Sequence, residues 1–136
     1  MGGHDLAEAA AGLVGSPFRL HGRDPLTGLD CIGLLAAALV ALGRRTDFPT
    51  GYQVRTDTFA GLASAARDHG FEPVSGPAVP GDVLFVKPGP AQLHLVIAAV
   101  APGQFIEAHA GIGRVVVRPG PMREPIIQHW RLAASA

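Results

Sequence analysis

Hydrophobic and polar positions divide the chain into a helical first half and a strand-rich second half. In residues 5–13, 31–42 and 56–68, apolar side chains recur at spacings of three and four, which is the pattern of a helix with one buried face. Glycine or proline follows each run and is expected to end it. The sequence therefore predicts three helices, the second of which is preceded by Asp30, a favourable N-cap residue.

Beyond Gly76 the pattern changes to short runs rich in Val, Ile and Phe, separated by glycine and proline. Such runs are typical of strands with hairpin-length connections. The predicted strands are residues 83–86, 93–100, 104–108 and 114–117, with 126–132 as a last strand returning to the sheet. Helices first and strands afterwards predict an α+β fold with an antiparallel sheet.

Length and charge narrow the class of protein. The 136 residues suit one domain over residues 1–136, and the 11 basic and 11 acidic side chains cancel, so we expect no nucleic-acid partner. The longest apolar stretch, residues 32–42, is shorter than the roughly 20 residues that span a membrane, so no membrane association is expected. The first residues lack the basic region of a signal peptide, so we expect synthesis in the cytoplasm.

The single cysteine, Cys31, is either a buried apolar thiol or a nucleophile. It follows the predicted N-cap Asp30 and so stands in the first turn of an apolar helix. The positive end of a helix favours thiolate, and its backbone amides suit the oxyanion of an acyl-transfer intermediate. This position favours a nucleophile, with no metal or organic cofactor required.

A cysteine nucleophile needs a base, and His94 lies within a strongly apolar predicted strand. A core histidine satisfied by a backbone carbonyl is the alternative. A base is usually oriented by a third polar group, and the two-residue period of a strand puts Glu107 and His109 on one face, together with Phe105. Spacing alone leaves the choice between Glu107 and His109 open.

These residues occur in motifs that resemble the NlpC/P60 cell-wall peptidases in the same order. The motifs are Gly15-Ser16-Pro17-Phe18, then Gly28-Leu29-Asp30-Cys31-Ile32-Gly33-Leu34, then Gly81-Asp82-Val83-Leu84-Phe85, then His94. Within the family, the run His21-Gly22-Arg23-Asp24-Pro25 and the Ile32 that follows the cysteine are most similar to peptidases of phage tails and gene transfer agents. The resemblance implies a papain-like fold and hydrolysis of D-γ-glutamyl-diaminopimelate or neighbouring bonds in peptidoglycan stem peptides.

The resemblance also implies site roles. Cys31 corresponds to the nucleophile, His94 to the base and Glu107 to the third catalytic residue, where most relatives carry histidine. A carboxylate there would raise the pKa of His94. Asp30 and Phe18 correspond to substrate-binding positions, although Asp30 is equally compatible with a plain N-cap.

Two departures from the family concern the substrate. Phe18 stands where many relatives carry tyrosine, and Ile32 where many carry serine, so both remove a hydroxyl from the expected cleft. Missing hydrogen-bond partners change specificity more than mechanism. The resemblance further implies a tail-tip or baseplate hub protein as carrier, in a particle that acts in the periplasm or cell wall. Two rival functions are a catalytically silent structural component of a tail tip and a thiol-dependent amidase or acyltransferase.

Overall fold

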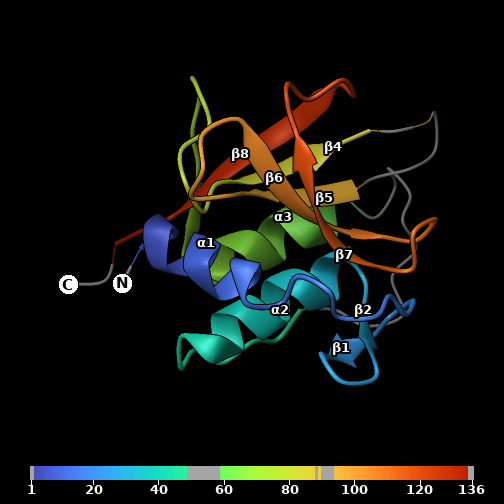
Figure 1. Ribbon diagram of the computed structural model, residues 1–136. Coiled ribbons are helices and arrows are strands. Elements are labelled where there is room, and N and C mark those ends of the chain that lie inside the picture. Colours follow the sequence, from blue (N-terminus) through green and yellow to red (C-terminus); the bar gives the residue numbers. More distant parts are fainter. Residues whose placement is uncertain (1, 49–58, 88, 90–93, 135–136) are drawn as a thin grey trace.

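The computed structural model describes residues 2–48, 59–87, 89 and 94–134. Its helices are α1 (Gly3–Ala11), α2 (Cys31–Ala41) and α3 (Phe59–Asp68). They match the three predicted helices within a few residues, and residues 56–58 lie outside the described part. Figure 1 shows α1 and α2 together on one side of a twisted sheet, and the first and last described residues, Gly2 and Ala134, lie near each other.

Six strands form one antiparallel sheet in the order β3-β8-β4-β5-β6-β7. They are β3 (Phe71–Pro73), β4 (Val83–Val86), β5 (His94–Ala98), β6 (Gln104–His109), β7 (Arg114–Pro119) and β8 (Ile126–Leu132). This confirms the predicted α+β class and the five predicted strands. The sequence did not predict β3, because three residues are too short to show an alternating pattern.

The last strand lies inside the sheet, between β3 and β4. Its Trp130 and Leu132 are buried, whereas Ile126 and Ile127 remain exposed. One buried carboxylate, Asp82, joins this strand to the start of β4. It accepts hydrogen bonds from the guanidinium of Arg131 at 2.8 and 2.9 Å and contacts His129 Nε2 at 2.6 Å. Asp82 therefore fixes two neighbouring strands at the end of the sheet away from His94.

The two faces of the sheet carry separate apolar clusters. Side chains such as Phe85, Leu95 and Ile106 pack with α2, which is apolar on nearly all sides because it lies between the sheet and α1. On the opposite face, Phe105 packs with Leu84, Val86, Val96 and Ala98. The alternation predicted for β6 is thus confirmed. Among the residues that the structure describes, no helix has the length and apolar character to cross a bilayer.

Candidate active site

Cys31 is the first residue of α2 and is only 6% exposed. Asp30 caps the helix as predicted, and its Oδ1 accepts a hydrogen bond from the Gly33 backbone at 2.8 Å. The same carboxylate accepts a second bond from the backbone N–H of His21 at 2.8 Å and a third from Arg23 Nη1 at 3.2 Å. The cap is therefore confirmed, and Arg23 balances the negative charge of Asp30, the residue before Cys31.

A short hairpin, β1 (Arg23–Asp24) and β2 (Gly28–Leu29), lies in the segment expected to be a loop. Glycines bring this hairpin against the start of α2. A Cβ on Gly33 would lie 1.9 Å from the carbonyl oxygen of Gly22, and one on Gly22 would lie 2.1 Å from that of Gly28. Backbone touches backbone here, so side chains are excluded and the first turn of α2 is held in one place. Two-residue strands give no periodicity from which to predict the hairpin.

His94 begins β5, which pairs with β6 only at Ile97 and Ala98. Helix α2, which begins at Cys31, packs against both strands, and Cys31 is near enough to His94 to act on its pKa. His94 Nε2 lies 3.8 Å from Glu107 Oε1. The structure thus brings together the three residues predicted from the sequence as the catalytic set.

The electrostatics of His94 follow from this position. Burial alone disfavours its imidazolium, but the interactions with Cys31 and then with Glu107 outweigh burial and raise the His94 pKa to about 9. The pKa of Glu107 is lowered, because His94 and then Arg118 outweigh the effect of its burial. A cationic imidazole near a cysteine and beside a buried carboxylate is an arrangement suited to acyl transfer.

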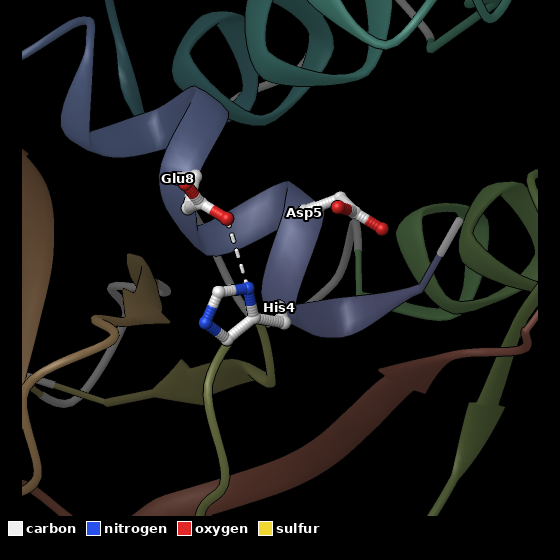
Figure 2. Close-up of side chains that lie close together, drawn as sticks. All are labelled: His4, Asp5 and Glu8. Atoms are coloured by element: carbon white, nitrogen blue, oxygen red, sulfur yellow. Dashed lines mark ion pairs between the residues drawn. The ribbon is translucent and has the colours of Figure 1, made fainter.

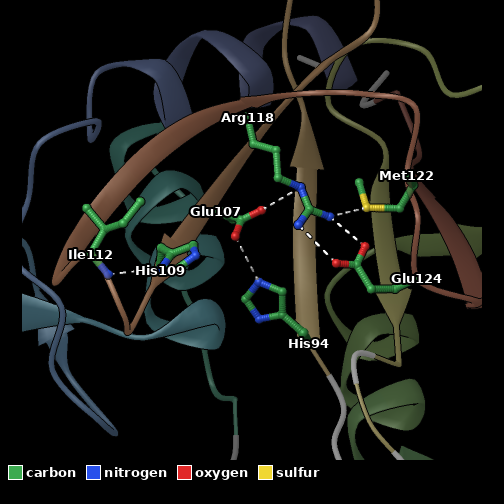
Figure 3. Close-up of polar contacts among 7 residues, drawn as sticks. All are labelled: His94, Glu107, His109, Ile112, Arg118, Met122 and Glu124. Carbon is green, nitrogen blue, oxygen red and sulfur yellow. Dashed lines mark hydrogen bonds and ion pairs between the residues drawn. The ribbon is translucent and has the colours of Figure 1, made fainter.

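His109 occupies the same face of β6 but is turned away from His94. Its Nδ1 accepts a hydrogen bond at 3.0 Å from the backbone N–H of Ile112 in the turn after the strand. Figure 3 shows Glu107 pointing toward His94 while the His109 ring lies beside Ile112. Of the two candidates for the orienting residue, the geometry therefore favours Glu107.

Two further residues, unnoticed in the sequence, lie behind Glu107. Arg118 Nε on β7 is 3.0 Å from Glu107 Oε2, and its guanidinium makes hydrogen bonds of 3.0 and 2.7 Å with Glu124. The predicted strand 114–117 ended one residue before Arg118. Because β6 and β7 pair at Phe105 and Arg118, the guanidinium comes within reach of the carboxylate two residues further along β6.

The remaining predicted positions are Phe18 and Ile32. Phe18 is partly buried against the core that contains Cys31. Ile32 is 2% exposed and belongs to that core, so the expectation that its side chain faces the cleft is wrong. Ile32 is carried inward by its place on α2, which is buried on nearly all sides.

One group of side chains in the described part of the chain has the composition of a metal site. His4, Asp5 and Glu8 on α1 can bring one ligand atom each within 4.8 Å of one another (Figure 2). However, Asp5 Oδ2 accepts a hydrogen bond from the Gly2 backbone at 3.0 Å, and His4 pairs with Glu8 at 2.9 Å. His4 and Glu8 are exposed, and such groups are common on surfaces without an ion.

Comparison with solved structures shows which fold this is. The NlpC/p60 domain of the peptidoglycan hydrolase SagA is similar with a TM-score of 0.64 and 26% identity, over 98% of this chain and 100% of that chain. The chain has the NlpC/P60 fold. NlpC2 from Trichomonas vaginalis is similar with a TM-score of 0.65 and 19% identity, over 96% of this chain and 49% of that chain.

A third similar structure is that of the peptidoglycan hydrolase RipB from Mycobacterium tuberculosis. It has a TM-score of 0.56 and 22% identity, over 93% of this chain and 61% of that chain. No family model matches the sequence, and no curated protein matches it. The NlpC/P60 fold expected from the motifs is therefore confirmed by structure alone, across nearly the whole chain.

Proposed function

We propose that this protein is a cysteine peptidase that hydrolyses peptide bonds in peptidoglycan stem peptides, of the D-γ-glutamyl-diaminopimelate type. The observation that carries the proposal is the position of His94, between Cys31 at the start of α2 and the buried carboxylate of Glu107. The similar structures of SagA and RipB, both named as peptidoglycan hydrolases, support the substrate class.

The proposed reaction has two steps. The Cys31 thiolate attacks the peptide carbonyl carbon, and the C–N bond breaks as His94 donates its proton to the leaving amine. Water then attacks the thioester carbon, giving its proton to His94, and the C–S bond breaks to release the acid and restore the thiolate. The backbone N–H of Cys31 lies in the first turn of α2, where no intrahelical acceptor is available, so it is suited to the oxyanion.

Asp30 and Phe18 are proposed as substrate contacts beside the nucleophile. Asp30 already accepts three hydrogen bonds, one of them from Arg23. A positively charged substrate group would have to compete with Arg23 for this carboxylate. We therefore expect the Asp30 contribution to substrate binding to depend on Arg23.

The experiment that tests the function is mass spectrometry of purified muropeptides incubated with the parent protein, Cys31→Ala and His94→Ala. New stem-peptide fragments from the parent alone would support the peptidase and identify the bond. If muropeptides stay intact while a lipid or small amide is consumed, the protein is a thiol-dependent amidase or acyltransferase. If nothing is consumed and iodoacetamide labels Cys31 no faster than a free thiol, the silent structural component is correct.

We also propose that a phage-tail-like particle carries the peptidase to the cell wall, bound to a tail-tip or baseplate hub protein. Support comes from the motif His21-Gly22-Arg23-Asp24-Pro25 and the residue after the cysteine, Ile32. The exposed Ile126 and Ile127 of β8 offer an apolar contact for the carrier. Purification of particles followed by detection of this chain tests the placement, and its absence from particles would remove the carrier while leaving the chemistry intact.

A further inference from the structure

Arg118 lies between two carboxylates at the edge of the candidate active site. Its Nε is 3.0 Å from Glu107 Oε2, while its Nη atoms bind both oxygens of Glu124 in the connection between β7 and β8. Figure 3 shows the resulting series of side chains running from His94 through Glu107 to Arg118 and Glu124. The single carboxylate of Glu107 is therefore shared by two cationic partners.

The two contacts of Glu107 are unequal. Its distance to Arg118 Nε is 3.0 Å, whereas its distance to His94 Nε2 is 3.8 Å. N–H···O hydrogen bonds have donor–acceptor distances of about 2.7–3.2 Å, so the contact with His94 is an ion pair without a hydrogen bond. Glu107 Oε2 is buried and its contact with Arg118 is not aligned as a hydrogen bond, so charge attraction holds it there.

We propose that Arg118, whose charge is shared between Glu107 and Glu124, is a positioning residue that draws the Glu107 carboxylate back and limits the strength of its pair with His94. This inference rests on the proposed function, in which His94 must release its proton to the leaving amine. An imidazolium paired too strongly with a carboxylate would be a weaker acid. Arg118 thus sets how readily the His94 imidazolium gives up its proton.

The charged groups that act on this pair come from several elements. Cys31 on α2 and Glu107 on β6 favour the imidazolium of His94, while Arg118 on β7 and His109 on β6 act on Glu107. Glu124 is coupled to Arg118 and feels the charge of His94. Charges therefore alternate in sign from His94 through Glu107 and Arg118 to Glu124, so removing one of these charges must change the electrostatic potential at its neighbour.

The test is a titration of the His94 ring by NMR in the parent and in three variants. Arg118→Met removes the competing cation, so the His94 pKa should rise by roughly half a pH unit or more. Glu124→Gln releases Arg118 to pair with Glu107 alone, so the His94 pKa should fall. Arg118→Lys keeps the charge and should stay nearer to the parent than Arg118→Met does.

A matched control is Arg131→Met, which removes an arginine from another buried carboxylate, Asp82, at the far end of the sheet. It should destabilise the fold without moving the His94 titration. Glu124→Gln and Arg118→Lys carry the test if Arg118→Met fails to fold, since Glu124 lies on a connection and is partly exposed.

Opposite shifts from changes at Arg118 and Glu124 would support the inference. Shifts in the same direction, no shift, or an equal shift in Arg131→Met would overturn it. The titration needs no substrate, so its outcome is separable from the proposed function. Intact muropeptides together with opposite shifts would reject the peptidase but keep Arg118 as the residue that tunes His94.

Discussion

Glu107 faces His94 with its Oε1 atom 3.8 Å from Nε2, from a side chain that is 3% exposed. The resemblance to NlpC/P60 peptidases led us to expect Glu107 at a position where most relatives carry histidine, and the side chain that faces His94 here is a carboxylate. The carboxylate contributes to the raised pKa of His94, as the sequence predicted. A charged partner in turn needs its own counter-ion, and Arg118 supplies it.

The first prediction separates the two candidates for the orienting residue. Glu107→Ala should lower kcat/KM on the order of 100-fold, because His94 loses the carboxylate that orients its ring and stabilises its protonated form. His109→Ala should remain within about threefold of the parent, since His109 contacts the turn at Ile112 instead of His94. Both are measured with the muropeptide substrate. The reverse order of effects would assign the orienting role to His109.

The second prediction concerns stability against pH. The His94 pKa is raised to about 9 from an ordinary value of 6.5, so the folded state binds this proton more tightly than the unfolded chain does. The resulting stability is fully present below about pH 6.5 and is lost as the pH rises toward 9, by at most about 3 kcal/mol. Urea unfolding of the parent at pH 6 and pH 9.5 measures the loss. His94→Gln should show a smaller loss, and parallel curves for the two proteins would contradict the prediction.

The third prediction concerns Asp82, the fully buried carboxylate that joins β4 to β8. Asp82→Asn should lower the free energy of unfolding by about 3 kcal/mol or more, since it breaks a buried pair with Arg131 and His129. Burial alone would raise the Asp82 pKa, but hydrogen bonds from Arg131, the Val79 backbone and His129 outweigh it and lower the pKa below 3.8.

The sign of the acid effect follows from that lowered pKa. Stability from Asp82 is present above about pH 3.8 and is lost as the pH falls through the lower pKa of the folded state. Urea unfolding at pH 7 measures the substitution, and a pH series down to 2 measures the acid effect. The control is Asp24→Asn, an exposed aspartate that caps its own turn, which should change stability by less than about 0.5 kcal/mol. Equal effects at Asp82 and Asp24 would show that the buried cluster adds no stability.

The fourth prediction tests the close approach of the hairpin to α2. In Gly33→Ala, the new Cβ would lie 1.9 Å from the Gly22 carbonyl oxygen, so the start of α2 must move. We expect a loss of about 2 kcal/mol or more and slower alkylation of Cys31 by iodoacetamide. Gly12→Ala is the control, because its Cβ would come no closer than 3.4 Å to a neighbouring atom. Undiminished alkylation in Gly33→Ala would show that the thiol does not depend on this contact.

Sequence alone was sufficient for the elements with a clear period. The apolar spacing of α2, the N-cap Asp30 and the alternation of β6 each place a site residue, and the structure agrees with all three. Such patterns are local, so they can be read without knowing which strands pair.

What the sequence could not give depends on contacts between distant segments. Arg118 reaches Glu107 only because β6 and β7 pair in one register, and Arg23 reaches Asp30 only because a two-residue hairpin folds back. Ile32 was expected in the cleft because the family motif places a hydroxyl there, but the orientation of α2 turns it into the core. The contacts of Arg118 and Arg23 depend on which strands pair, and the burial of Ile32 depends on which way α2 is rotated. A linear motif contains neither kind of information.

The position of β8 has a consequence for how the protein is made. Cys31 is synthesised before all six strands of the main sheet, whereas β8, the strand between β3 and β4, is synthesised after every other described strand. Pairings between such distant segments form slowly, because the entropy cost of closing a long loop comes before any stabilising contact is made. A growing chain therefore carries its cysteine before the sheet that holds His94 and Glu107 is complete. Reactivity of the thiol, to the extent that it depends on His94, should therefore arise only when the fold is finished.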